Sequence, residues 1–234
     1  MFRSWFGEPE RIDSGTLRQA FSAISDYRAL LAGLIEKQTP QCETYTRYEL
    51  WSRGLGNALD ELEESVYCAG RFGALVTHRQ EERMDGEELA NYRRHVYFAK
   101  NGFIRLFSIL DKLGYLMNDL LRLRTERVKR KFSYFTVLRQ MQHLHADPAL
   151  AGPLLDIKER YREPLSRLRH KRNMDIHLVN AEMLDDLLHI DACRTDRTYI
   201  EDLDASMDDL RLGLAMACET IATFFAYAHK KKRV

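Results

Sequence analysis

Hydrophobic residues recur at steps of three and four positions along most of this chain, which is the spacing of one face of an α-helix. Only 5 prolines and 12 glycines interrupt the pattern. No stretch alternates apolar and polar residues between turn-forming residues, as a half-buried strand would. The pattern therefore predicts an all-α fold, an antiparallel helical bundle.

The individual helices follow from where the apolar spacing starts and stops. The predicted helices cover residues 16–37, 43–76, 87–124, 133–145, 153–180 and 197–229. The third carries the most continuous apolar stripe, so we expect it at the centre of the bundle. The last alternates steps of four and three from Leu203 to Ala228, which favours coiled-coil packing along a long neighbour.

Charge is unevenly distributed although the formal net charge of the 234 residues is only +1. Basic residues concentrate in 122–131, in 158–172 and at the end of the chain, and acidic residues concentrate in 182–209. If the basic stretches converge in space, they form an electropositive surface suited to a polyanion. Alternatively, each is an independent solvated helix face.

Several classes of protein do not fit the sequence. The N-terminus lacks the long apolar run of a secretory signal, and no run of about 18 apolar residues occurs, so we expect a cytoplasmic protein without a membrane span. The 4 cysteines are widely separated, which is typical of reduced thiols. Common phosphate-loop, dinucleotide, zinc-protease and hydrolase motifs are missing, and we expect neither a metal nor a cofactor.

One segment offers a catalytic pattern, Arg172-Asn173-Met174-Asp175-Ile176-His177. Asn173 and His177 are four positions apart and share a helix face, while Arg172 must reach across with its long side chain. An arginine can clamp a phosphate, and a histidine can move the proton of a ribose 2′-hydroxyl. The trio therefore predicts metal-independent cleavage of RNA.

An all-helical chain with R-N-x-x-x-H near its end resembles the HEPN superfamily. That resemblance implies a homodimeric ribonuclease in which the motifs of two subunits face one cleft, with Arg172 and His177 as catalytic residues and Asn173 as a positioning group. It also implies a role as a toxin with an antitoxin, or as an antiviral-defence effector with a partner protein. The tyrosine of toxins paired with a nucleotidyltransferase is replaced here by Val179.

The spacing from arginine to histidine is a weak motif by itself. Arg71 with His78 and Arg139 with His145 satisfy it too, but only Arg172 is followed by asparagine. On an earlier helix, Asp111 is the candidate that orients the motif, within a polar seam that also includes Ser108, Tyr115 and Asn118. The cations predicted to contact RNA are Arg124, Arg127, Lys129, Arg130, Lys131, Arg169 and Lys171.

We predict a single domain, in which residues 14–76 form an N-terminal helical extension and residues 87–234 a HEPN-like core. Two other functions remain open. In the first, the chain is a non-catalytic module that binds a nucleotide, RNA or a protein through the same basic surface. In the second, it is a structural protein that dimerises through the seam from Leu203 to Ala228. In the structural case, Leu210→Glu should give monomers.

Overall fold

The computed structural model describes residues 2–127, 132–173 and 200–233, and every regular element in these ranges is a helix. The elements are η1 (Phe2–Phe6), α1 (Gly15–Glu36), α2 (Cys42–Gly73), η2 (Glu81–Arg83), α3 (Gly86–Leu120), η3 (Thr125–Arg127), α4 (Tyr134–His143), α5 (Pro148–Arg160), α6 (Arg162–Asn173) and α8 (Leu203–Arg233). The predicted all-α fold is confirmed.

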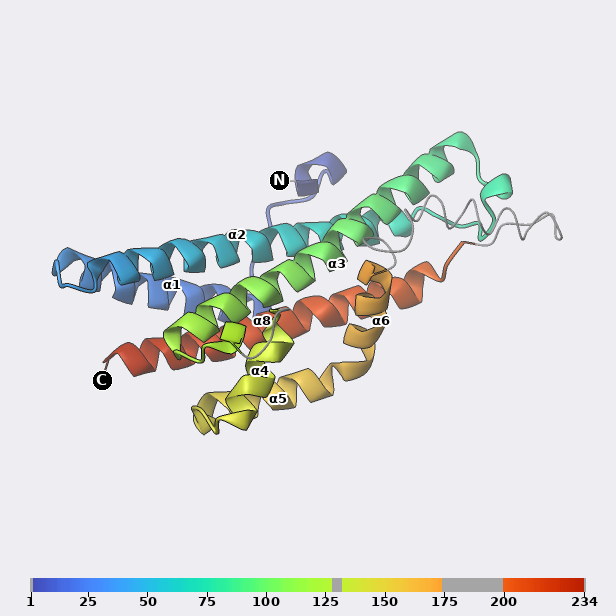
Figure 1. The fold of residues 1–234 in the computed structure, drawn as a ribbon. Helices are drawn as coiled ribbons and strands as arrows, with labels where there is room; N and C mark the ends of the chain where they lie inside the picture. Colours follow the sequence, from blue (N-terminus) through green and yellow to red (C-terminus); the bar gives the residue numbers. More distant parts are fainter. Residues whose placement is uncertain (1, 128–131, 174–199, 234) are drawn as a thin grey trace.

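Four long helices, α1, α2, α3 and α8, run lengthwise through the molecule, and the shorter α4, α5 and α6 lie on one side of them (Figure 1). Helix α2 packs most extensively on α3, and α8 packs along α1 while also touching α2, α3, α5 and α6. The expected long neighbour of the last helix is therefore α1. Because α8 contacts both the long helices and the side layer, it fixes the position of α6 relative to α3.

The core is built from the apolar stripes that the spacing predicted. Leu106, Leu110 and Leu113 of α3 are fully buried, as are Ile221 and Phe224 of α8. Such side chains contribute about 1.5 to 3 kcal/mol each when removed from water, which is the main driving force for a bundle of this kind.

The seam from Leu203 to Ala228 does not form an exposed dimer interface. Leu210 is 2% exposed and Ala228 is 0% exposed within the single chain. The seam therefore belongs to the core of one subunit, and the dimerisation surface proposed for it was wrong. Leu210→Glu would bury a charge in that core and unfold the chain instead of separating subunits.

Two glycines set the distance at which α8 crosses its neighbours. A Cβ atom on Gly213 would lie 2.7 Å from Leu106 Cδ2 of α3 and 2.9 Å from Leu168 Cδ1 of α6. A Cβ atom on Gly102 of α3 would lie 3.0 Å from Leu210 Cδ2 of α8. At both crossings a larger side chain would require the packed leucines, or the helices that carry them, to shift.

Most helix ends lie within a few residues of the prediction, but the helix predicted over 153–180 is different. It consists of α5, which begins at Pro148, and α6, which begins at Arg162. Asp147 precedes α5 with a φ of 43°, in the left-handed region, so the chain turns sharply there and Pro148 occupies the first helical turn. Residues 174–180 of that predicted helix lie outside the described residues.

The last predicted helix also differs at its start, since α8 begins at Leu203 and residues 200–202 are not helical. By length and composition alone, Leu203–Lys231 could cross a membrane, with a mean hydropathy of 1.2 over its most apolar window. Half of that window is buried inside the structure, and the core helix of a soluble protein passes the same test. The expected absence of a membrane span remains a prediction.

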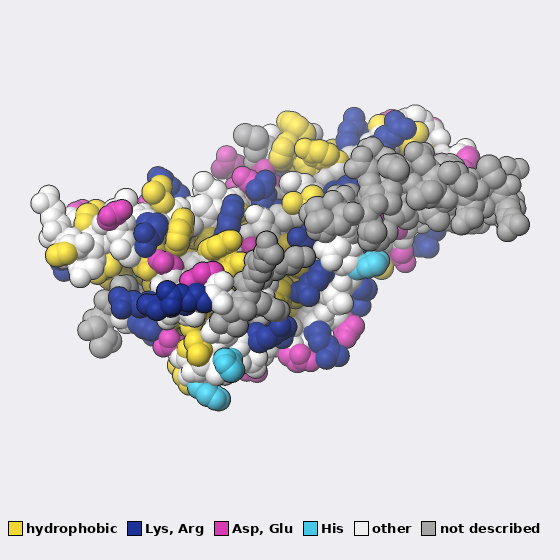
Figure 2. All heavy atoms as spheres, viewed as in Figure 1, with side chains coloured by type: hydrophobic (Ala, Val, Ile, Leu, Met, Phe, Trp, Pro, Cys, Tyr) yellow, Lys and Arg dark blue, Asp and Glu magenta, His cyan; other side chains and the backbone are white. Residues whose placement is uncertain are grey.

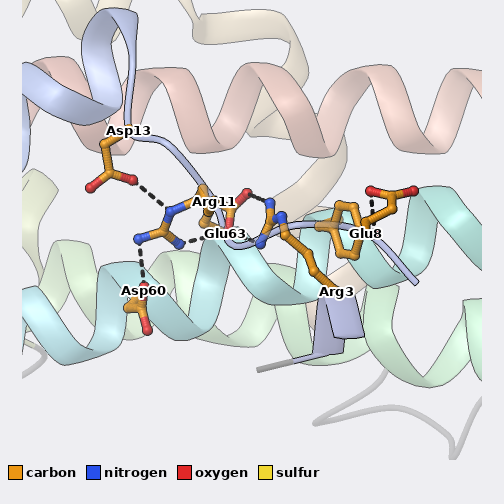
Figure 3. Close-up of polar contacts among 7 residues, drawn as sticks. Arg3, Glu8, Arg11, Asp13, Asp60 and Glu63 are labelled. Carbon is orange, nitrogen blue, oxygen red and sulfur yellow. Dashed lines mark hydrogen bonds and ion pairs between the residues drawn. The ribbon is translucent and has the colours of Figure 1, made fainter. Parts of the chain in front are cut away.

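The segment before α1 is fastened to α2 by a network of ion pairs. The guanidinium groups of Arg3 and Arg11 both bond to the Glu63 carboxylate, whose side chain is only 12% exposed (Figure 3). Arg11 also pairs with Asp60 at 2.7 Å and with Asp13 at 2.6 Å. Burial lowers the pKa of Arg11, but these bonds outweigh it and hold the pKa above its ordinary value.

Candidate active site

The candidate site lies where the middle of α3, the start of α4 and the end of α6 meet. Gly114 of α3 allows the close approach, because a Cβ atom there would lie 3.0 Å from Tyr134 Cα at the first position of α4. One turn earlier on α3, Asp111 accepts a hydrogen bond from the Tyr134 N–H at 3.1 Å. The Asp111 carboxylate therefore sits at the N-terminal end of α4, where a helix favours negative charge.

The environment of Asp111 is only partly polar. Burial raises the pKa of its carboxyl above the ordinary value. The Tyr134 N–H and the positive charges of two arginines, Arg172 and Arg169, oppose this effect. The predicted orienting residue is thus close enough to Arg172 for their charges to interact.

Arg172, the arginine of the motif, lies in the last turn of α6. Its guanidinium carbon is 5.0 Å from the centre of the Phe107 ring on α3, a distance typical of a cation–π contact. Its Nε atom is buried and has no hydrogen-bond partner among the described residues. A buried guanidinium N–H without an acceptor is costly, so this position is suited to a ligand that brings an acceptor.

Arg169 lies one turn before Arg172 and faces the same region. Its guanidinium carbon is 4.3 Å from the centre of the Phe135 ring on α4. Burial and the like charge of Arg172 lower its pKa, and Asp111 opposes this. Among the described residues no ion pair joins Asp111 to either arginine, so its carboxylate partly balances the two cations without contacting them.

Of the other two predicted motif residues, Asn173 lies within the described residues and His177 does not. Asn173 is the last residue of α6 and is half-buried. His177 lies outside the described residues, so its position relative to Arg172 stays a prediction. The oriented carboxylate and the arginine are thus brought together, whereas the histidine is not described.

The predicted RNA-contacting cations are divided among several places. Lys171 donates to Glu201 at 2.9 Å and to Ser206 Oγ at 2.7 Å, so its ammonium is already engaged by the start of α8. Arg124 and Arg127 belong to the α3–α4 connection, which Asn118 of the polar seam holds by accepting the Thr125 N–H at 3.0 Å. Arg169 lies over Phe135, and Lys129, Arg130 and Lys131 lie outside the described residues.

Figure 2 shows Lys and Arg side chains gathered over α6 and the neighbouring part of the side layer, on the face that carries the candidate site. Arg169 comes from the second predicted basic stretch, and Arg124 and Arg127 come from the first. The connection containing η3 contacts α4, whose Phe135 lies under Arg169. The two stretches therefore approach each other through α4.

Within the described residues, no group of three His, Cys, Asp or Glu side chains is arranged to hold a metal ion. The described cysteines are free thiols, with Cys68 and Cys218 buried and Cys42 half-buried. Cys193 lies outside the described residues. The polar groups gathered at the candidate site are arginines and one carboxylate.

Two parts of the site were missed by the sequence reasoning. Phe107 belongs to the apolar stripe predicted for the third helix, but its ring also supports Arg172, which the stripe did not indicate. The Tyr134 N–H was not connected with Asp111, because the two residues are 23 positions apart and meet only through packing of α4 on α3. The polar seam on α3 was the one available signal, since Asp111 bonds to the first residue of α4 and Asn118 bonds to the connection before it.

Comparison with known proteins identifies the family. The family model described as Cthe2314-like HEPN matches residues 51–229, from within α2 to near the end of α8. The match therefore includes part of the predicted N-terminal extension, and the boundary between extension and core stays a prediction. Neither a curated protein nor a solved structure matches the chain. Because the family match covers more than half of its length, the chain belongs to the Cthe2314-like HEPN family.

Proposed function

We propose that this HEPN protein is a metal-independent endoribonuclease whose catalytic residues are Arg172 and His177. The observation that carries the proposal is the Arg172 guanidinium at the end of α6, which interacts with the charge of Asp111 and whose buried Nε has no acceptor among the described residues. A phosphate oxygen supplies that acceptor, and phosphate is the ligand for which a guanidinium is best shaped.

The chemistry follows from the side chains. A motif histidine takes the proton of a ribose 2′-hydroxyl, and the 2′-oxygen attacks the adjacent phosphorus. Arg172 stabilises the negative charge that develops on the phosphate. The bond from phosphorus to the 5′-oxygen breaks, and the leaving oxygen receives a proton from a protonated motif histidine. The products are a 2′,3′-cyclic phosphate and a 5′-hydroxyl.

The proposal includes a homodimer, because the HEPN resemblance places two copies of the motif across one cleft. Asn173 positions the histidine, and Asp111 orients Arg172 through its charge and through its hold on α4. The cytoplasmic location, and the role as a toxin or a defence effector, belong to the same proposal. Growth arrest on expression of the wild type but not of His177→Ala supports that role, and equal growth contradicts it.

The test is cleavage of single-stranded RNA by the purified chain in excess EDTA. Arg172→Ala and His177→Ala should each abolish cleavage while the circular dichroism and the mass of the native particle stay unchanged. Arg139→Ala and His145→Ala are matched controls, because this exposed pair has the same type of spacing and should tolerate the change. A DNA strand of identical sequence should stay intact, since it lacks the attacking hydroxyl.

Cleavage that persists in both Arg172→Ala and His177→Ala removes the catalytic assignment. Products that end in a 3′-hydroxyl remove the 2′-attack mechanism. Either result leaves the family membership untouched.

A non-catalytic HEPN module that binds RNA, a nucleotide or a protein is the second candidate. The contact of Arg172 with Phe107 favours it, because a guanidinium supported on a core ring also has a packing role. This candidate predicts salt-dependent RNA binding without product on any RNA tested.

A further inference from the structure

A stacked aromatic pair lies beside the candidate site. Tyr115 of α3 and Phe132 of the α3–α4 connection are nearly parallel, with ring centres 4.1 Å apart and planes inclined by 20°. Tyr115 is 55% exposed although one face of its ring rests on Phe132. The rest of the ring is therefore available to solvent.

The pair lies on the same parts of α3 and the α3–α4 connection as the groups that surround the arginines. Tyr115 follows Asp111 by four positions on α3, which is about one helical turn or 6 Å. The charge of Asp111 acts on both Arg169 and Arg172, and Arg169 lies over Phe135, which is three positions after Phe132. An exposed cation, Lys112, lies on the intervening turn of α3. The exposed Tyr115 ring and the two arginines are thus grouped where α3, α4 and α6 meet.

The rise of about 6 Å along α3 from Asp111, whose charge acts on the arginines, to Tyr115 is of the order of the distance between a base and its own phosphate. Proteins that bind single-stranded nucleic acid combine a cationic track with exposed aromatic rings on which bases stack. Base stacking of this type tolerates any sequence, because every base has a π-face. A double helix does not present its bases in this way, so the arrangement favours single-stranded RNA.

We propose that Tyr115, supported by Phe132, is a base-stacking platform for single-stranded RNA, with the phosphate of the stacked nucleotide bound by Arg169. This inference rests on the proposed ribonuclease function and adds to it a substrate-positioning site outside the Arg172–His177 motif. The large exposed fraction of Tyr115 distinguishes the platform from a simple anchor of the connection, because an anchoring ring would be buried.

The test uses fluorescein-labelled oligouridylate and oligoadenylate with the full-length, cleavage-deficient His177→Ala protein. Adding Tyr115→Ala should weaken binding of both oligomers roughly tenfold, the order of magnitude of one lost base stack. Tyr115→Phe keeps the ring and should retain binding. Tyr97→Ala is the matched control, since Tyr97 is 68% exposed on the same helix α3 but lies far from Asp111 in sequence, near the start of that helix.

A second comparison uses an oligomer in which every internal nucleotide is abasic. It should bind equally to the proteins with and without Tyr115→Ala, and Arg169→Ala should still weaken its binding. If Tyr115→Ala binds the normal oligomers as tightly as the Tyr97→Ala control, the platform is overturned. Equal weakening of normal and abasic oligomers by Tyr115→Ala overturns it as well.

The two proposals fail in different ways. Loss of the platform leaves RNA cleavage by the wild type and its dependence on His177 intact. If the wild type binds RNA through Tyr115 but never cleaves it, the ribonuclease function fails and the stacking site remains.

Discussion

The Asp111 carboxylate of α3 accepts the backbone N–H of Tyr134 at the first turn of α4, with an oxygen–nitrogen distance of 3.1 Å. This single bond connects the candidate site to the packing of α4 on α3. It holds the start of α4 against α3, and it fixes a negative charge beside Arg169 and Arg172.

Removal of that carboxylate should affect both stability and cleavage. Asp111→Ala leaves the Tyr134 N–H without its acceptor, which should cost about 1 to 3 kcal/mol in the free energy of unfolding. Urea unfolding measures the loss. Asp111→Asn keeps an acceptor oxygen and should lose less stability, so an equal loss in both variants would contradict the role of the hydrogen bond.

The raised pKa of Asp111 also predicts that the stability of the chain depends on pH. Because burial raises the pKa of this carboxyl in the folded chain, the folded state binds its proton more tightly than the unfolded state does. The unfavourable contribution of this group is therefore fully present at neutral pH and disappears as the pH falls through the raised pKa.

The wild type should accordingly gain stability relative to Asp111→Asn when the pH is lowered from neutrality toward the ordinary pKa of 3.8. Parallel thermal unfolding of both proteins across that range measures the difference. A wild type that loses stability relative to Asp111→Asn over the same range has the opposite sign and would show that the folded pKa is depressed.

Gly213→Ala should disturb the site from a distance. The added methyl would lie 2.7 Å from Leu106 of α3 and 2.9 Å from Leu168 of α6, so both leucines, or the helices that carry them, must move away from α8. We expect a loss of about 1 to 3 kcal/mol, typical of overpacking. RNA cleavage should fall as well, because Leu168 directly precedes Arg169.

Gly152→Ala on α5 is the control for this change, since a Cβ atom there meets nothing within 4 Å. It should be neutral or stabilise the helix by up to about 1 kcal/mol. Equal stability of Gly213→Ala and Gly152→Ala would contradict the close packing of α8 on α6 at Gly213.

Glu63→Gln should loosen the segment before α1. The change removes the charge shared by Arg3 and Arg11 at a position that is only 12% exposed, and should cost about 1 to 3 kcal/mol. Limited proteolysis should then cut the first residues more rapidly. Glu61→Gln on the same helix is the control, because its pair with Arg105 is 51% exposed on the Glu61 side and should contribute at most about 1 kcal/mol.

The cysteines should differ strongly in reactivity. Burial raises the pKa of the Cys218 thiol to about 12 and that of Cys68 to about 11, so neither forms much thiolate at neutral pH. In a Cys193→Ser background, a disulfide reagent should modify native Cys42 and reach the other two only after denaturation. Rapid modification of Cys218 in the native chain would contradict its burial in α8.

The sequence was sufficient for most of the helices and for the family. Apolar steps of three and four residues predicted the helices and the buried stripe of α3, because helical periodicity is a local property that each segment carries by itself. The Arg172-Asn173 pair and the spacing to His177 indicated a HEPN protein, and the family match agrees with that interpretation.

Tertiary packing decided which residues meet. The same spacing suits a core seam or a dimer interface, and only the packing of α8 on α1, α2 and α3 placed the seam from Leu203 to Ala228 inside one chain. Likewise, the position of Arg172 on Phe107 and of Asp111 at the Tyr134 N–H depends on how α3, α4 and α6 cross. Local patterns cannot specify such crossings, because they depend on the shapes of side chains that are distant in the sequence and close only after folding.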